Sequence, residues 1–326
     1  AFLSVLAGFV IAWKRTPKKK PKLLAAASAM IAIAVFVAAS TSFLVKAEAL
    51  ASDFGNLADA YQNYGFAYCF SRSLLDRGID KPDNYCEEEV AGILRTLGAD
   101  VAQRPVSTPN IIMVQMESFF DVNYFKELSF SENPVPVFTK LKESGAHGFL
   151  TVPSIGAGTA NTEFEILTGM NLGYFGAGEY PYKSVLQKET CESICYNLKE
   201  LGYTNHAIHN HEGTFYLRHV VFSNLGFDTF TSLEYMSNVK YTPIGWAKDA
   251  VLTEEVVKAL ASTPGQDFIY AITVQAHGKF PKEATEEMQP ITIAGIEDEK
   301  KQYAFEYFVN QLHETDAFIG ALISEL

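Results

Sequence analysis

The sequence predicts an α/β protein, with a mostly parallel sheet covered by helices, that follows a membrane anchor. The 326 residues are 48% apolar and 20% charged, which excludes a disordered, collagen-like or coiled-coil chain. The charge is divided unevenly: residues 1–50 hold seven Lys/Arg and one acid, net +6, whereas the other 276 hold 19 and 37, net −18. Beyond residue 109, short apolar runs alternate with helical patterns, which is typical of a parallel sheet.

Residues 1–45 form the predicted membrane region. Residues 23–45 carry no charge and are long enough to cross a bilayer core of about 30 Å. Residues 1–13 are apolar but shorter, so we interpret them as part of a helix and expect further spans before it. The loop 14–22 holds six Lys/Arg, which the positive-inside rule assigns to the cytoplasm, leaving everything after residue 45 outside the cell. Flanking apolar segments argue against nucleic-acid binding by this loop, and a cleaved signal peptide is the alternative for 23–45.

The rest of the chain divides into a helical connector, 46–105, and a domain, 106–326. The connector patterns predict helices at 56–68 and 85–97. In the domain, the predicted strands are 110–116, 148–152, 204–209 and 268–274, and the predicted helices are 137–144, 185–201, 214–225, 249–262 and 300–326. The last pattern continues past Gly320 and no strand follows it, so we expect the C-terminal part of this domain to be missing. Catalytic groups in such sheets lie just past the carboxyl ends of the strands.

Two candidate residues lie where the first predicted strand ends and where a helix begins. Glu117 directly follows 110–116, where a carboxylate can be a metal ligand, a general base or a helix cap. Thr159 follows Gly156-Ala157-Gly158, at the start of a helical pattern whose free N–H groups and dipole favour an anion. A metal-bound hydroxyl there can attack phosphorus. The residues alone favour the plainer alternative, in which Thr159 or Thr162 caps the helix and Glu165 closes a capping box.

Two further candidate segments follow the later strands. His209 and His211 can form a metal pair, and Arg218 can bind phosphate through two N–H groups or pair with a surface acid. His277 follows 268–274 and is either structural or part of the site. The P-loop, dinucleotide-binding and zinc-protease motifs are all absent. Four features at strand ends thus suit metal-assisted attack of a hydroxyl on a phosphate ester.

Four segments in order resemble the lipoteichoic acid synthase family, membrane-anchored phosphoglycerol transferases of the sulfatase/alkaline phosphatase superfamily. They are NIIMVQMESF at 110–119, GTANTEF at 158–164, TFYLR at 214–218 and TVQAHGKF at 273–280, and YGFAY at 64–68 in the connector is similar too. The resemblance runs from the membrane helix to Leu326. It implies a sulfatase-like α/β fold outside the membrane and one divalent metal, Mn²⁺ or Mg²⁺.

The resemblance also implies roles for individual residues. Glu117 matches a metal ligand and Thr159 the metal-bound nucleophile, whereas Arg218 and His277 match residues that bind the substrate phosphate. Tyr216 stands where these synthases commonly have Trp, and it can pack against glycerol. The implied reaction moves glycerol phosphate from phosphatidylglycerol, through a phosphoglycerol–threonine intermediate, to a glycolipid or a polyglycerol-phosphate chain at the cell membrane.

One departure from the family pattern concerns the metal site. The family completes it with an Asp-His pair on a later strand, and no Asp-His dipeptide occurs in this sequence. We interpret this as truncation and expect the chain as it stands to bind metal weakly and to be inactive. The alternatives are another phosphotransferase or hydrolase of the superfamily, such as a phosphoethanolamine transferase or a phosphodiesterase, and a non-catalytic surface protein of the same fold. A sulfate substrate is disfavoured, because no Cys lies in a C/S-x-P-x-R motif.

Overall fold

The computed structural model describes residues 23–51, 54, 56–76, 78–98, 108–154, 158–283, 285 and 290–326. The predicted partial helix 1–13 and the basic loop 14–22 lie outside these residues. The chain divides into two compact units, Ala1–Phe54 and Gly55–Leu326, which are described separately.

The first unit contains helix α2 (Leu23–Lys46), which ends within one residue of the predicted membrane span. Its segment Ala27–Lys46 has a mean hydropathy of 2.2, so by length and composition it can cross a membrane. A signal sequence near an N-terminus has the same properties, and the alternative therefore stays open.

The second unit begins with the connector helices α3 (Leu57–Tyr64), α4 (Phe66–Leu75) and α5 (Glu87–Gly98). The predicted helix 56–68 is divided at Gly65, and its second half continues to Leu75. Asn56 begins the first of these helices, because its side chain accepts the N–H groups of Ala58 and Asp59.

The main sheet has four parallel strands in the order β1-β5-β3-β4. They are β1 (Ile111–Gln115), β3 (Thr204–His209), β4 (Thr229–Ser232) and β5 (Asp267–Ile272). Ile272 is paired with Gln115 on one side and with His209 on the other, so these strands end at one edge. Three of the four strands match the prediction. Strand β4 does not, because its sequence, Thr-Phe-Thr-Ser, is too short and polar to stand out.

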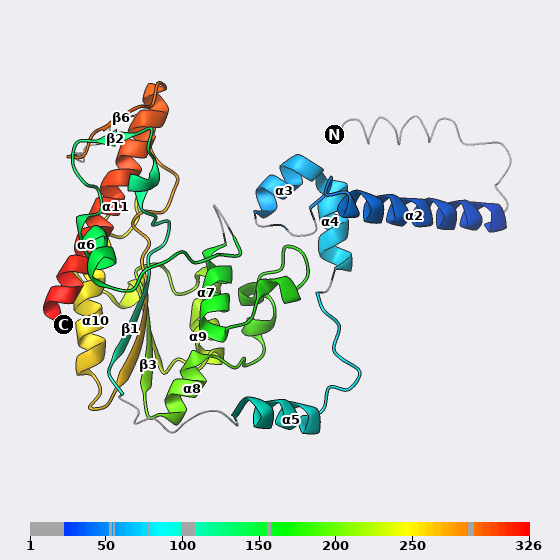
Figure 1. Cartoon of the computed structure of the whole chain (residues 1–326), viewed down its shortest axis with the longest axis horizontal. Helices are drawn as coiled ribbons and strands as arrows, with labels where there is room; N and C mark the ends of the chain where they lie inside the picture. The colour runs from blue at the N-terminus through cyan, green and yellow to red at the C-terminus, as the bar shows by residue number, and fades with distance from the viewer. Residues whose placement is uncertain are drawn as a thin grey trace. The chain divides into compact units, whose positions relative to one another are not determined.

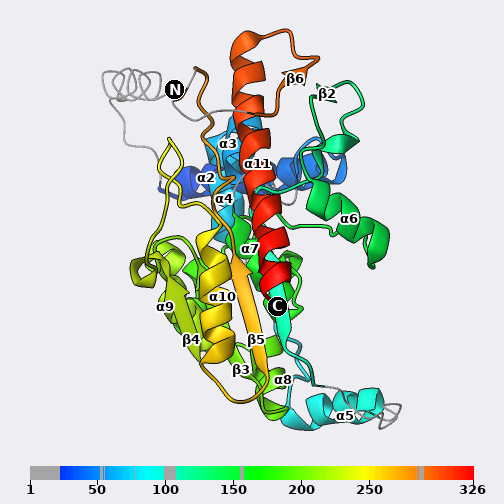
Figure 2. The ribbon, with the colours of Figure 1, turned by 90° about the vertical axis from the view of Figure 1, so that its left-hand side faces the viewer.

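Helices cover both faces of this sheet (Figures 1 and 2). Helices α7 (Thr159–Thr168), α8 (Ile194–Glu200) and α9 (Arg218–Asn224) lie on one face, and α10 (Val251–Ala261) and α11 (Glu299–Glu325) on the other. The central strand β5 supplies both cores: Phe268, Tyr270 and Ile272 pack toward the first set of helices, and Ile269 and Ala271 toward the second. This is the predicted α/β architecture.

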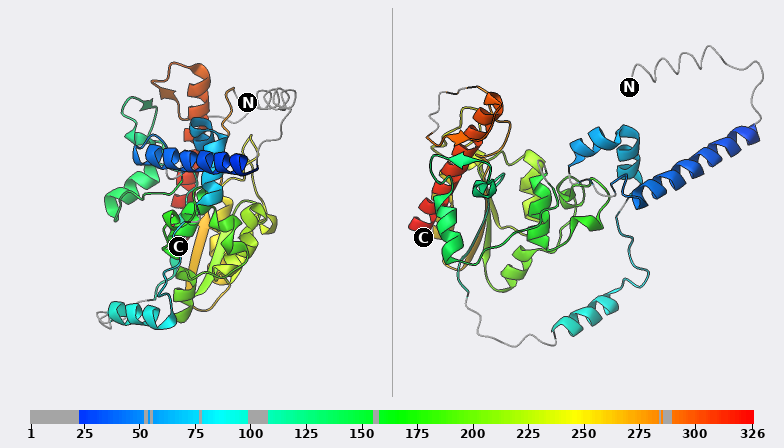
Figure 3. Two further views of the ribbon diagram at one scale, coloured as in Figure 1. Left: turned by 90° about the vertical axis from the view of Figure 1, so that its right-hand side faces the viewer. Right: turned by 45° about the horizontal axis from the view of Figure 1, so that its top comes forward.

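A smaller part of the second unit lies along the long helix α11, as Figure 3 also shows. Helix α6 (Pro136–Ser144) packs on α11, and the strands β2 (Ser129–Phe130) and β6 (Ile293–Ala294) form an antiparallel pair. Helix α11 continues through Gly320, as its apolar pattern predicted.

Three predicted elements are wrong. Residues 148–152 form no strand, and Phe149 is 89% exposed, because no neighbouring strand pairs with this segment. The predicted helix 185–201 begins only at Ile194, after two 3₁₀ turns, η3 (Pro181–Lys183) and η4 (Val185–Gln187). The predicted helix 214–225 is a 3₁₀ turn, η5 (Phe215–Leu217), followed by α9. A left-handed kink at Tyr216 and Leu217 separates these two elements.

Candidate active site at the carboxyl edge of the sheet

Glu117 lies at the carboxyl edge of the sheet, as predicted, two residues beyond the end of β1. Its backbone N–H donates to the hydroxyl of Thr273 (2.9 Å), which directly follows β5. Ser118 then adopts a left-handed conformation, with φ +59°, and turns the chain sharply. The carboxylate is 8% exposed, so two adjacent strand ends hold it in a fixed and poorly hydrated position.

Thr159 is the first residue of α7, and its Oγ1 donates to Oε1 of Glu117 across 2.5 Å. Gly158 is the N-cap, with φ +84°, and contributes no side-chain hydrogen bond. Glu165 closes no capping box, because its carboxylate accepts the N–H of Leu172 (2.6 Å). The capping alternative is therefore wrong, and the Thr159 hydroxyl is directed at the carboxylate rather than at the helix backbone.

Burial and neighbouring groups shift the pKa of Glu117 in opposite directions. Burial raises the pKa of this carboxyl, and the hydrogen bond from Thr159 and the charges of His277 and Arg218 lower it only in part. The net pKa lies above the ordinary value for glutamate. A bound cation would therefore stabilise the ionised form of this carboxylate.

Arg218 is a second buried charge at the site. It is the first residue of α9 and 2% exposed, and it is paired with Glu163 of α7, which is fully buried. Nε donates to Oε2 of Glu163 (3.1 Å) and Nη2 to Oε1 (2.5 Å), whereas Nη1 is buried without a hydrogen-bond partner among the described residues. Burial lowers the pKa of the guanidinium, but Glu163 more than offsets this and raises it above its ordinary value. The Nη1 edge of the guanidinium thus remains available to an anion.

Glu163 was not singled out by the sequence analysis. Its position, four residues after Thr159, places it one helical turn away on the same helix. That spacing within GTANTEF was the available signal. The alternative in which Arg218 pairs with a surface acid is wrong, because the acid is buried.

Tyr216 covers Arg218, with 5.3 Å between the ring centre and Cζ. The left-handed backbone of Tyr216, with φ +58°, places this ring beside the site. The ring also stacks on Tyr180, at 6.4 Å and 13°. Burial raises the pKa of the Tyr216 hydroxyl, with Tyr180 as the next contribution, so this group stays neutral.

His277 is half-buried and lies against Trp246, with ring centres 4.6 Å apart. Trp246 also contacts His211 at 5.6 Å, and no sequence pattern predicts this contact, because Trp246 lies in a loop without periodicity. His209 and His211 stack at 5.7 Å. However, Nδ1 of His209 donates to the carbonyl of Ile272 (2.9 Å). Burial, assisted by the charge of Arg218, lowers the pKa of His209 well below its ordinary value.

The available metal ligands at this edge are few. Within the described ranges, no group of three or more His, Cys, Asp or Glu side chains could hold a metal ion. The Glu117 carboxylate and the Thr159 hydroxyl supply two oxygen donors of the kind that Mg²⁺ and Mn²⁺ prefer. The donor set thus fits a hard cation in kind and provides part of its coordination.

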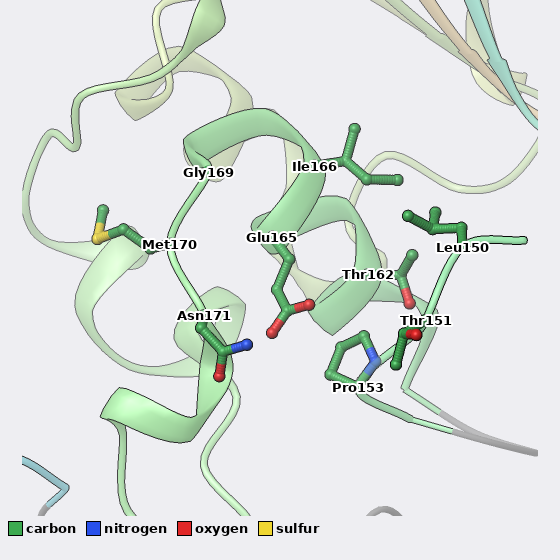
Figure 4. Close-up of a pocket in the computed structure, with 9 residues that line it drawn as sticks. All are labelled: Leu150, Thr151, Pro153, Thr162, Glu165, Ile166, Gly169, Met170 and Asn171. Atoms are coloured by element: carbon green, nitrogen blue, oxygen red, sulfur yellow. The ribbon is translucent and has the colours of Figure 1, made fainter.

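A cavity of about 230 Å³ lies on another side of α7 (Figure 4). Thr162, Glu165 and Ile166 of α7 line it together with Leu150 and Pro153. Glu117 and Thr159 do not line it, so the residues brought together by the strand ends form a separate site.

A parallel sheet between two helical layers, with a hydroxyl held against a carboxylate at its carboxyl edge, is the arrangement expected of the predicted sulfatase-like α/β class. The family model described as "Sulfatase" matches residues 109–326. The chain belongs to the sulfatase family.

A curated relative is a provisionally named cyclic beta-1,2-glucan modification protein of Rhizobium meliloti (strain 1021). It is 29% identical to this chain over 221 residues, which are 68% of this chain and 33% of the relative. The chain thus spans about a third of the length of this relative.

Two solved structures share the fold. The Streptococcus pyogenes phosphoglycerol transferase GacH, in complex with sn-glycerol-1-phosphate, has a TM-score of 0.64 and 22% identity, over 76% of this chain and 66% of that one. The lipoteichoic acid synthase LtaP from Listeria monocytogenes has a TM-score of 0.55 and 18% identity, over 72% of this chain and 57% of that one. These likenesses confirm the predicted sulfatase-like fold.

Proposed function

We propose that the protein is a membrane-anchored phosphoglycerol transferase whose nucleophile is Thr159. The observation that carries the proposal is the 2.5 Å contact of the Thr159 hydroxyl with Glu117 at the N-terminus of α7. Nη1 of Arg218, which is buried and has no hydrogen-bond partner in the described ranges, adds a phosphate-binding group at the same site. The names of GacH and LtaP support the choice of a glycerol phosphate group over other phosphate esters.

In this proposal, Glu117 and Thr159 hold one divalent cation, Mn²⁺ or Mg²⁺. When bound, such an ion lowers the pKa of a coordinated hydroxyl and stabilises negative charge on phosphate oxygens. Their two oxygen atoms are already adjacent, so binding requires little rearrangement of these two side chains. Chelation by EDTA is expected to abolish activity, and added Mn²⁺ or Mg²⁺ to restore it.

The proposed reaction is a double displacement. Thr159 Oγ1 forms a bond to the phosphorus of phosphatidylglycerol, and the bond from phosphorus to the diacylglycerol oxygen breaks. Diacylglycerol leaves as the alcohol, with the proton that the threonine lost. The hydroxyl of a glycolipid or a polyglycerol-phosphate chain then attacks the phosphoglycerol–threonine, and its proton returns to Thr159.

The remaining site residues position the transferred group. Arg218, which Glu163 holds in one orientation, binds the phosphate oxygens through Nη1. Tyr216 packs against the glycerol carbons, and His277 lines the phosphate pocket. The helix α2 keeps the catalytic unit at a lipid surface, and the positive-inside rule directs that unit to the outside of the cell.

The test follows labelled phosphatidylglycerol in membranes that contain the full-length protein. Thr159→Ala is expected to abolish turnover. Thr162→Ala is the matched control, because Thr162 lies one helical turn further along α7 and faces the cavity instead of Glu117. Retained turnover in Thr159→Ala would refute the assignment of Thr159 as the nucleophile.

The same assay separates the alternatives by substrate and product. Phosphatidylethanolamine is offered as a competing donor, and release of free glycerol phosphate is measured beside transfer. Preference for phosphatidylethanolamine would assign a phosphoethanolamine transferase, and release without transfer would assign a phosphodiesterase. No turnover of either lipid, with membranes and metal intact, would favour a non-catalytic protein of this fold.

A further inference from the structure

A lysine that forms no ion pair with an acid in the described part of the chain lies beside the proposed active site. Lys183 ends the turn η3, and its side chain is exposed. Its Nζ is 4.8 Å from the ring centre of Tyr180 and 4.9 Å from that of Tyr216. No ion pair joins Lys183 to any other described residue. Contact with the rings fixes the position of the ammonium while leaving N–H donors for a ligand.

The two tyrosines connect this ammonium to the reacting groups. A Cβ on Gly158, directly before Thr159, would lie 2.8 Å from Oη of Tyr180. The ring of Tyr216 contacts both Arg218 and Lys183, with 5.3 Å from its centre to Cζ of Arg218 and 4.9 Å to Nζ of Lys183. The two cations can therefore be no further apart than the sum of these distances, 10.2 Å.

We infer that Lys183, together with Tyr180 and Tyr216, binds a phosphate that the acceptor already carries. This inference rests on the proposed function. The donor brings a single phosphate, which reacts at Thr159 and pairs with Arg218, so it has no second charge for Lys183. An acceptor that ends in glycerol phosphate brings one, and so does a glycan that already bears a phosphoglycerol group.

The charge of the chain makes this local cation more important. Residues 51–326 carry a net charge of −18, which repels an anionic acceptor at long range. Lys183 and Arg218 provide the opposite sign at the site itself. Because Lys183 is exposed, added salt screens its contribution more strongly than that of the buried Arg218.

The test measures transfer from phosphatidylglycerol by the full-length protein to two matched pairs of acceptors. One pair is glycerophosphoglycerol and neutral diglycerol, and the other is a glucan oligosaccharide with and without a phosphoglycerol substituent. The variant Lys183→Gln is compared with Lys188→Gln, which removes an exposed lysine five residues further along the same segment. Lys183→Arg keeps the charge.

Lys183→Gln is expected to raise KM for the phosphate-bearing acceptors about fivefold, the size of a partly exposed charge-assisted contact. In Lys183→Gln, KM for the neutral acceptors and for phosphatidylglycerol is expected to stay unchanged. Lys188→Gln is expected to behave as wild type. Lys183→Arg is expected to keep most of the wild-type preference for the phosphate-bearing acceptors. The acceptor pair in which Lys183→Gln raises KM more shows whether the bound phosphate belongs to a glycerol phosphate chain or to a substituted glucan.

Equal effects on charged and neutral acceptors, or no effect, would overturn this inference while leaving the proposed function intact. A raised KM for phosphatidylglycerol alone would place Lys183 on the donor and also overturn it. If the wild-type protein transfers to no acceptor in either pair, the proposed function fails, and this inference fails with it.

Discussion

The ion pair between Arg218 and Glu163 offers the sharpest test of the site. Glu163 is fully buried and Arg218 is 2% exposed, and two hydrogen bonds of 3.1 and 2.5 Å join them. Glu163→Gln keeps the volume of the side chain but removes its charge. The variant therefore creates no cavity and leaves a buried guanidinium without its counter-ion.

The expected cost follows from this burial. Breaking a buried pair from one side destabilises a protein by about 3–5 kcal/mol. Glu117 lies close enough to interact with Arg218 and supplies some compensation, so we expect about 3 kcal/mol. At about 2–4 °C per kcal/mol for a domain of this size, the midpoint of thermal unfolding falls by about 6–12 °C.

The assay is thermal unfolding of the full-length protein, with turnover of phosphatidylglycerol measured in parallel. Glu254→Gln is the control, because it breaks an ion pair with Lys258 in which both side chains are more than half exposed. This control is expected to leave the midpoint within about 1 °C of wild type. Turnover is lost in Glu163→Gln, since the guanidinium is no longer held toward the phosphate.

A double variant separates stability from function. Glu163→Gln combined with Arg218→Met removes the unpaired charge, so about 1–3 kcal/mol of the lost stability returns. Activity is not expected to return, because the proposed phosphate-binding group is absent. If Glu163→Gln costs no more stability than Glu254→Gln, or if the double variant is less stable than the single one, the buried-pair reasoning is refuted.

Three further predictions concern neighbouring residues. Burial holds the pKa of His209 below its unfolded value, so lowering the pH below about 6.5 costs up to about 1.4 kcal/mol of unfolding free energy per unit. Urea unfolding at pH 7 and pH 5.5 should show this slope, and His209→Gln should remove it. Asp249→Asn places an amide against two backbone N–H donors and a threonine hydroxyl, and about 2–4 kcal/mol is lost in the same unfolding assay. Gly158→Ala displaces Tyr180 and lowers kcat/KM at least tenfold, whereas Gly169→Ala, with positive φ but open space around it, keeps the activity near that of wild type.

The sequence was sufficient to predict the elements that position Glu117 and Thr159. An apolar strand that ends in Glu117, and glycines that lead into a helix at Thr159, are local signals whose physical causes lie within a few residues. The strand end explains the position of Glu117, whereas the meeting with Thr159 depends on how α7 packs on the sheet, because among the described residues no strand directly precedes this helix. The roles assigned to Arg218, Tyr216 and His277 by resemblance stay predictions, although the structure brings all three to this edge.

The parts that sequence reasoning missed depend on tertiary contacts. The spacing from Thr159 is the one local signal for Glu163, and it does not predict the burial of this acid, which follows from the position of Arg218, 55 residues later. The kink at Tyr216 is not predicted by composition, because neither of its left-handed residues, Tyr216 and Leu217, is a glycine. Residues 148–152 have the composition of a strand, but pairing requires a neighbour that composition does not reveal.

The ion pair between Arg218 and Glu163 uses only part of the guanidinium. Glu163 accepts from Nε and Nη2 of Arg218, and within the part of the chain that the structure describes Nη1 is buried and unsatisfied. An unpaired buried donor costs about 1–3 kcal/mol, and a phosphate oxygen that takes this position recovers that cost on binding. An arginine paired at all its donors would stabilise the fold more and bind phosphate less. Under the proposed function, the unsatisfied donor lowers the stability of the fold at Arg218, and it leaves a guanidinium already oriented for a phosphate before the substrate binds.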